Sequence, residues 1–321
     1  MSMAIVASKP GSVDILEWKK IEVSEPKDNE VKISHTAIGV NFIDTYHRTG
    51  RYPGINYPTV LGVEGAGIIT KVGESISNFS VGDRVCYPLS VGSYCEERVI
   101  NEDILVKIPD NISDEHAAAG ITKGITVHHL FNISRKIEKN DWVLFHAAAG
   151  GVGLIACQWA KAKGINLIGT VSNAEKEELA LKYGAKQIIN YKEKDFVNEV
   201  LEITNNKGVA AAFDGIGGDS PKRSIRCLST FGTLCTFGAS SGPSNLSIED
   251  LPPSIQYTKG SIATLIQNKN MLNIAASEFM NLLGNGDIKI EIGQRYDLKD
   301  AGKAHSDLEN RKTTGSIILK P

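Results

Sequence analysis

The sequence feature that most constrains the fold is an apolar run that leads directly into a glycine-rich loop. Residues 142–147 (WVLFHA) have the apolar composition of a parallel strand buried on both faces. The loop AAAGGVG follows at residues 147–153, and residues 150–163 have the pattern of a helix that stops at Gly164. A strand, a glycine loop and a helix in this order predict a βαβ unit, and therefore a parallel sheet.

The region that follows continues this alternation of strands and helices. The expected strands are residues 166–171, 187–190, 209–214 and 233–237, the expected helices are residues 174–183, 195–204 and 220–228, and residues 261–266 are a candidate for a sixth strand. Helices of this length between successive strands predict an α/β domain with a Rossmann-type, doubly wound parallel sheet.

The remaining segments have a different, β-rich character. Short β-type runs at residues 31–38, 67–72 and 84–87 are separated by Gly and Pro turn signals. The chain turns helical again after about residue 270 and ends in the β-like segment GSIILKP. The simplest arrangement returns this tail to the first domain. We therefore expect a discontinuous β-rich domain of residues 1–122 and 267–321, and an α/β domain of residues 123–266.

Composition and charge disfavour several classes of partner. The formal net charge of −2 gives no long-range attraction to nucleic acid or to an anionic membrane. No run approaches the roughly 18 apolar residues of a membrane span, and the N-terminal segment does not have the pattern of a secretory signal. The five scattered cysteines are interpreted as reduced, buried thiols, and a cytoplasmic location is expected.

The glycine loop is the most specific local motif. Gly150 and Gly151 lack side chains, so the backbone there can approach a pyrophosphate closely, and with Val152 they begin a helix whose N–H groups favour an anion. Ala148 takes the place of the first glycine in G-x-G-x-x-G, so the strict fingerprint is broken. The βαβ context nevertheless predicts a dinucleotide site.

The residues after the second strand of this domain distinguish NADP from NAD. NAD enzymes place an Asp or Glu there to bind the ribose hydroxyls, whereas this chain has Ser172 and Asn173, with Lys176 one turn into the helix. Hydroxyl, amide and ammonium groups can bind a 2′-phosphate that a carboxylate would repel. NADPH is therefore favoured over NADH. The alternative interpretation of Lys176 is an exposed helix lysine.

Several segments together resemble one family. The segments are GVNFIDTY at residues 39–46 with R-x-G at 48–50, GVEGAG at 62–67 and the AAAGGVG loop. With these, the chain resembles the zinc-independent quinone oxidoreductases of the medium-chain dehydrogenase/reductase superfamily, akin to zeta-crystallin, nearly from end to end. The resemblance implies a GroES-like catalytic domain, a Rossmann cofactor domain, a cleft between them and a homodimer.

The resemblance also implies a set of cofactor-binding residues. These are Asn41, Phe42 and Tyr46 on the nicotinamide side; Gly150, Gly151 and Val152 at the pyrophosphate; Ser172, Asn173, Lys176 and Tyr191 around the 2′-phosphate; Phe237, Gly238, Ala239, Thr264 and Leu265 at the nicotinamide end; and Thr126 and Arg311.

Metal ligands are missing where zinc-dependent relatives carry them. Those relatives have a G-H-E segment whose His binds zinc, but Val63 stands between Gly62 and Glu64 here. We therefore expect no zinc, and an electron-poor acceptor such as a quinone or a conjugated enone that needs only a hydride. Asn41, Tyr46 and Tyr52 are the candidate catalytic donors for the charge that develops on the acceptor.

Other interpretations remain open beside these. An alkenal or enone reductase needs the same hydride geometry, and a low-turnover NADPH-binding protein, crystallin-like or RNA-binding, needs no catalysis at all. Tyr46 is either a donor or a stacking residue, Glu64 is structural or part of the cleft, and residues 261–266 are a strand that could pair across a dimer. Asp44 and Arg48 are expected to pair with each other, and His146 is expected to be a satisfied core histidine.

Overall fold

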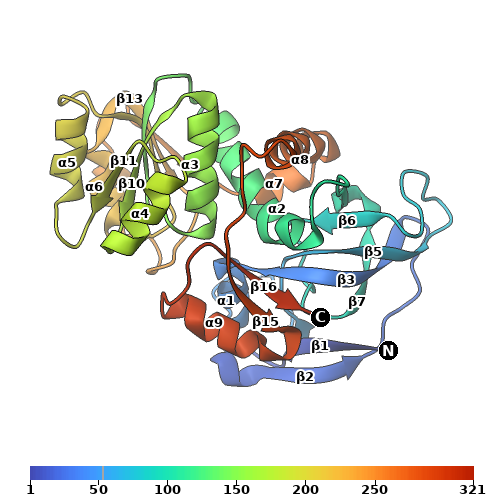
Figure 1. The fold of residues 1–321 in the computed structure, drawn as a ribbon. Coiled ribbons are helices and arrows are strands. Elements are labelled where there is room, and N and C mark those ends of the chain that lie inside the picture. The colour runs from blue at the N-terminus through green and yellow to red at the C-terminus, as the bar shows by residue number, and fades with distance from the viewer. Residues whose placement is uncertain (53) are drawn as a thin grey trace. The chain divides into compact units, whose positions relative to one another are not determined.

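The computed structural model describes residues 1–52 and 54–321, which form two compact units. The first unit comprises Met1–Ile125, Ile266–Gly284 and Ile290–Pro321, and the second comprises Thr126–Leu265 and Asn285–Lys289. Each is described by itself below, with the element labels of Figure 1.

A six-stranded parallel sheet forms the centre of the second unit. Its strands are β9 (Trp142–Phe145), β10 (Asn166–Val171), β11 (Gln187–Asn190), β12 (Val209–Asp214), β13 (Leu228–Thr236) and β14 (Gln256–Lys259). They lie in the order β11-β10-β9-β12-β13-β14, and all neighbouring pairs are parallel. The order reverses between β9 and β12, so the predicted doubly wound sheet is confirmed.

Helices of the second unit pack against this sheet. They are α3 (Gly151–Lys163), α4 (Ala174–Lys182), α5 (Phe196–Ile203) and α6 (Ser220–Ile225), and a π-helical turn occupies His129–Ser134. α3 and α4 contact β10, whereas α6 contacts β12 and β13 (Figure 1). Crossover connections between parallel strands are right-handed, and here they run outward from both sides of the reversal point. They place α3 and α4 on one face of the sheet and α5 and α6 on the other. Helix α6 ends three residues before the expected end at residue 228, because Leu228 already begins β13.

The expectation of a strand at residues 261–266 is wrong. Ile262–Ile266 is a helix (α7), and the sixth strand is β14, one segment earlier. β14 has the sequence QYTK and lies at the sheet edge, where a strand needs no apolar run, so its pattern is weak. The apolar residues that suggested a strand instead bury one side of α7, with Ile262 and Leu265 spaced three apart.

The first unit is built on a seven-stranded sheet. Its strands are β15 (Ile292–Asp297), β16 (Ser316–Lys320), β3 (Glu30–Val40), β5 (Glu64–Val72), β6 (Arg84–Tyr87), β8 (Val106–Lys107) and β7 (Glu97–Asn101), the last paired with β3. Strands β2 (Leu16–Ile21), β1 (Ser2–Ala7) and β4 (Thr59–Val60) form a smaller sheet. β16 pairs antiparallel with β3, so the C-terminal tail returns to the β-rich unit.

The helices of the first unit place its candidate site residues. They are α1 (Phe42–Arg48), most of α2 (Asp114–His128), α8 (Lys269–Gly284) and α9 (Ala301–Glu309), with 3₁₀ turns at Val13–Ile15, Glu102–Ile104 and Leu298–Asp300 and, in the second unit, at Ile248–Asp250. α2 and α8 approach closely at two glycines. A Cβ on Gly120 or Gly124 would lie 2.7 Å or 2.2 Å from the Phe279 ring. Phe279 therefore fills a groove in α2 that only glycine leaves open.

The structure tests the expected state of the cysteines and shows whether its helices could cross a membrane. All five cysteines are buried and unpaired with one another, which confirms the interpretation of reduced thiols. Among residues 1–52 and 54–321, no helix combines the length and the apolar composition needed to cross a membrane.

Candidate functional site

The loop between β9 and α3 forms an anion cradle at the carboxyl end of the parallel sheet. Gly150 is the N-cap of α3 and offers no side-chain acceptor to the first turn, which also lacks acidic residues. The N–H groups of that turn have no partner within the helix. A Cβ on Gly153 would lie 2.4 Å from the carbonyl oxygen of Ala147 and 2.6 Å from that of Ala148, so the loop lies flat against the helix. Such a surface fits a dinucleotide pyrophosphate.

The loop between β10 and α4 lies beside it, at the same end of the sheet. Asn173 is the N-cap of α4, and its Oδ1 accepts the backbone N–H of Lys176 at 2.9 Å. The N–H of Tyr191 donates to the carbonyl of Val171 at 3.0 Å, which brings the exposed Tyr191 next to Ser172. Ser172, Asn173, Lys176 and Tyr191 are thus brought together as the sequence predicted, with no carboxylate directly after β10. This group fits a 2′-phosphate.

A change at Lys176 is expected to alter cofactor preference. Lys176→Glu should lower kcat/KM for NADPH by about 10- to 100-fold and leave kcat/KM for NADH within about twofold, because only the 2′-phosphate meets the new charge. Steady-state oxidation of both cofactors measures the ratio. Lys182→Glu, at the other end of α4, is the matched control. An unchanged ratio would assign Lys176 to the solvated helix face.

The segment after β13 forms another loop at the carboxyl end of the sheet. The N–H of Phe237 donates to the carbonyl of Asp214 at 2.9 Å, and its ring lies 5.6 Å from that of Phe145. A Cβ on Gly238 would lie 2.8 Å from the carbonyl oxygen of Gly215, so this loop packs tightly on the loop after β12. Ala239 follows directly.

Four other predicted cofactor residues lie on separate elements. Thr264 and Leu265 are on α7, and the Leu265 side chain is only 2% exposed. Thr126 lies on α2, and Arg311 follows α9 with a left-handed backbone (φ 60°). Their roles in cofactor binding stay predictions.

The predicted catalytic residues of the first unit lie on α1 and directly before and after it. Asn41 is the N-cap of α1, and its Nδ2 donates to Glu64 Oε1 at 2.6 Å. The Tyr46 ring is buried, 6.5 Å from the Phe42 ring and 5.3 Å from the half-exposed Tyr52 ring. The Arg51 guanidinium lies 4.9 Å from the centre of the Tyr46 ring. Polar donors and an aromatic surface therefore occur side by side.

The expected ion pair between Asp44 and Arg48 is wrong. The Arg48 guanidinium binds the carboxylate of Glu309 on α9, at 2.8 Å, and Asp44 instead accepts hydrogen bonds from the Asn41 N–H at 2.8 Å and the Tyr94 hydroxyl at 3.0 Å. The sequence suggested a local i,i+4 pair on α1. The partner of Arg48 lies 261 residues away along the chain, whereas Asp44 bonds Asn41 and Tyr94.

Sequence reasoning missed two buried groups beside this cluster. Lys123 on α2 donates to Glu64 Oε1 at 2.7 Å, and His305 on α9 bonds the Tyr94 hydroxyl at 2.9 Å. The signal for Lys123 was available, because it is the only charged residue in residues 117–125, whose other members are Ala, Gly, Ile and Thr. His305 carries no such signal.

Burial raises the pKa of Asp44 to about 7, with a further increase from the Glu64 carboxylate and opposing effects from the Asn41 N–H, Tyr94 and Lys123. The folded pKa thus exceeds the ordinary value of 3.8. Between these two values the folded state holds a proton that the unfolded state has released, so this group's contribution to stability falls as the pH rises from about 4 to about 7. Asp44→Asn should make the decrease in stability with rising pH smaller. Melting temperatures of both proteins from pH 5 to 8 measure it, and parallel curves would contradict it.

The sequence interpretation of His146 is confirmed. His146 is buried, its Nδ1 lies 2.9 Å from Thr170 Oγ1 and its Nε2 lies 2.8 Å from Ser224 Oγ, and burial lowers its pKa. It is a satisfied core histidine. Cys157 is buried on α3, where burial raises its thiol pKa to about 12. It serves packing.

The residues around Glu64 do not fit a catalytic zinc. Val63 replaces the histidine ligand of the zinc-dependent pattern, and both Glu64 oxygens already accept hydrogen bonds, from Asn41, Lys123 and the Thr122 N–H. In the part of the chain that the structure describes, no three His, Cys, Asp or Glu residues form a group that could hold a metal.

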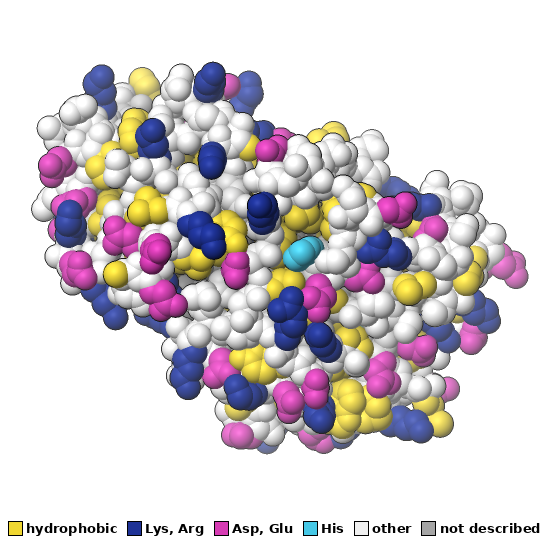
Figure 2. Space-filling model, viewed as in Figure 1, with side chains coloured by type: hydrophobic (Ala, Val, Ile, Leu, Met, Phe, Trp, Pro, Cys, Tyr) yellow, Lys and Arg dark blue, Asp and Glu magenta, His cyan; other side chains and the backbone are white. Residues whose placement is uncertain are grey.

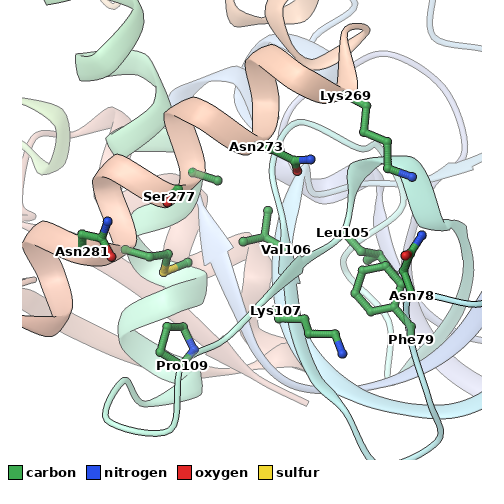
Figure 3. Close-up of a pocket in the computed structure, with 12 residues that line it drawn as sticks. Asn78, Phe79, Leu105, Val106, Lys107, Pro109, Lys269, Asn273, Ser277 and Asn281 are labelled. Atoms are coloured by element: carbon green, nitrogen blue, oxygen red, sulfur yellow. The ribbon is translucent and has the colours of Figure 1, made fainter.

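A hollow of about 440 Å³ lies in the first unit (Figure 3). α8 lines it with Asn273, Ser277 and Asn281, and the segment around β8 contributes Val106 and Lys107. No predicted site residue lines it.

Family models of known proteins match parts of both units. A family model described as "Zinc-binding dehydrogenase" matches residues 151–277, and one described as "Alcohol dehydrogenase GroES-like domain" matches residues 27–110. Quinone oxidoreductase 1 of Escherichia coli (strain K12) is 43% identical over 327 residues, with 100% of both chains covered.

A second curated relative and a solved structure add to this. The 2-haloacrylate reductase of Burkholderia sp is 36% identical over 331 residues, which cover 100% of this chain and 99% of that one. The crystal structure of E. coli quinone oxidoreductase complexed with NADPH is similar with a TM-score of 0.96 at 42% identity, covering 99% of this chain and 100% of that one. The GroES-like assignment of the β-rich unit is thereby confirmed.

Proposed function

This chain belongs to the quinone oxidoreductase family of the medium-chain dehydrogenase/reductase superfamily, and on that premise we propose that it reduces quinones with NADPH as the reductant. One observation carries the proposal. At the carboxyl end of its parallel sheet, the second unit has a glycine-rich loop that fits a pyrophosphate. The loop after the next strand presents hydroxyl, amide and ammonium groups in place of a carboxylate.

The residues proposed to hold NADPH include those at that end of the sheet. Gly150, Gly151 and Val152 would bind the pyrophosphate, and Ser172, Asn173, Lys176 and Tyr191 the 2′-phosphate. The proposed set is completed by Asn41, Phe42, Tyr46, Thr126, Phe237, Gly238, Ala239, Thr264, Leu265 and Arg311. The E. coli relative is known in complex with NADPH, which supports this choice. When bound, the nicotinamide supplies a hydride, and the protein supplies orientation and a dry surface.

Asn41 is the proposed donor to the acceptor oxygen. One N–H of its amide is bound to Glu64, which orients the amide and leaves the second N–H to meet developing negative charge. Tyr46 and Tyr52 contribute phenol groups, and their rings, tilted against each other, form an apolar wall with Phe42 that excludes water. No metal takes part, since the residues around Glu64 do not fit one.

Reduction of an activated alkene is the second candidate. The observation that favours it is the 2-haloacrylate reductase relative, whose named substrate is an electron-poor alkene. Hydride delivery and oxyanion stabilisation would serve both acceptors. The two proposals differ in the acceptor that fits the site.

Acceptor comparison tests the proposal. The purified protein is assayed for NADPH oxidation with 1,4-benzoquinone, a naphthoquinone and an α,β-unsaturated aldehyde, each with and without a zinc chelator. We expect the highest kcat/KM with a quinone, unaffected by the chelator. A higher kcat/KM with the aldehyde would favour the alkene reductase. Tight NADPH binding without turnover of any acceptor would leave an NADPH-binding protein, crystallin-like or RNA-binding.

The remaining proposals concern organisation. We propose a cytoplasmic homodimer that binds neither membrane nor nucleic acid, with domain boundaries at residues 1–122 and 267–321 against 123–266. The buried thiols support the cytoplasmic location. The net charge of −2 supports the lack of membrane and nucleic-acid partners, and Figure 2 shows acidic and basic side chains interspersed over the face in view. Residues 261–266 do not supply a pairing strand, because they form α7.

A further inference from the structure

A buried ion pair in the first unit is not needed to explain its fold. Glu64, at the start of β5, has no exposed surface, and Lys123 on α2 is 5% exposed, with Nζ and Oε1 2.7 Å apart. Removing both charges from water is costly, so a buried pair is weak support for stability. The buried Glu64–Lys123 pair is better explained by the side chain that it holds in place.

The Glu64 carboxylate holds the side chain of Asn41. Oε1 accepts from both Lys123 Nζ and Asn41 Nδ2, and Oε2 accepts the N–H of Thr122. Since an ionised carboxylate only accepts, the nitrogen end of the Asn41 amide must face it. The direction of the amide is thereby fixed.

The backbone opposite Glu64 is shaped to admit this carboxylate. Gly39 of β3 pairs with Glu64, and a Cβ there would lie 2.2 Å from Oε1 and 2.5 Å from the carbonyl oxygen of Ala118. Any larger residue would displace the oxygen that both Asn41 and Lys123 bind. The Asn41 backbone is held as well, because Asp44 Oδ2 accepts its N–H at 2.8 Å.

We propose that Glu64 and Lys123 are positioning residues that orient the Asn41 amide toward the acceptor oxygen. Lys123 pairs with the carboxylate, and Glu64 binds one amide N–H so that the other points away from it. Neither residue touches the acceptor. The inference rests on the proposed function, since it assigns a task to the donor named there.

Kinetics of paired variants test the assignment. Glu64→Gln and the neutral double variant Glu64→Gln/Lys123→Met are expected to lower kcat by about 10- to 100-fold with KM for NADPH within about twofold, because a misdirected donor costs transition-state stabilisation and not cofactor binding. The double variant leaves no unpaired buried charge, so it is expected to fold even if a single variant does not. Lys269→Met, which breaks an exposed pair with Asp103 in the same unit, is the control and should keep wild-type kcat.

The Asn41→Ala background separates positioning from a merely structural role. If Glu64 acts through Asn41, Glu64→Gln added to Asn41→Ala should lower kcat no further. An equal loss on both backgrounds, or a folded double variant with wild-type kcat, would overturn the inference. An inactive wild-type protein is the separate sign that the proposed function has failed, and it would overturn both.

Discussion

Gly153→Val is expected to weaken NADPH binding by about 100-fold or more and to abolish turnover at ordinary cofactor concentrations. A Cβ at this position would lie 2.4 Å and 2.6 Å from two backbone carbonyl oxygens, and backbone cannot rotate aside as a side-chain end can. The loop must therefore move away from α3, and with it the N–H groups that face the pyrophosphate. Equilibrium titration of the protein with NADPH measures the dissociation constant.

Two further variants make this result specific. Gly153→Ala should weaken binding by a smaller factor, since it adds the Cβ without its branches. Gly302→Ala, on α9, is the control, because its Cβ would have no neighbour closer than 3.9 Å. Gly302→Ala should leave affinity unchanged. Wild-type affinity in Gly153→Val would mean that the pyrophosphate binds elsewhere.

Asn41→Ala is expected to lower kcat by about 10²- to 10³-fold, the usual effect of removing one donor from a developing oxyanion. The KM for NADPH should change little if the amide serves the acceptor. The loss should exceed that of Tyr52→Phe, because the Tyr52 ring is half exposed and its hydroxyl can be replaced by water. A large increase in KM with unchanged kcat would assign Asn41 to cofactor binding alone.

Stability must be followed beside this variant. Asn41 bonds Glu64, so Asn41→Ala also leaves one donor fewer on a buried carboxylate that keeps Lys123 and the Thr122 N–H. We expect a modest drop in melting temperature that does not account for the loss of kcat. Unfolding of the variant at the assay temperature would contradict this account of the remaining bonds.

Segments of the α/β unit were predictable where strong local signals bound them. The strands Asn166–Val171 and Val209–Asp214 have the predicted bounds, because each apolar run lies between helix stops and turn residues. α5 begins one residue after its predicted start at residue 195, since Asp195 is its N-cap and its Oδ1 accepts the N–H groups of Val197 and Asn198. β14 was missed because a short edge strand with exposed polar residues carries no such signal.

The candidate site shows the same division between local and long-range information. The loops after β9 and β10 could be placed together from sequence, because the carboxyl ends of parallel strands share one edge. The partners of Arg48 and Glu64 could not. Glu309 lies on the C-terminal helix and Lys123 on α2, and only the folded unit brings them to α1 and β5.

The most direct test of the central claim is the rate of reduction of 1,4-benzoquinone by the wild-type protein with NADPH and, in parallel, with NADH. We expect turnover with NADPH and a kcat/KM for NADPH at least about tenfold above that for NADH, since the loop after β10 offers a 2′-phosphate site and no carboxylate directly after the strand. Equal rates with both cofactors, or no quinone reduction despite NADPH binding, would contradict it.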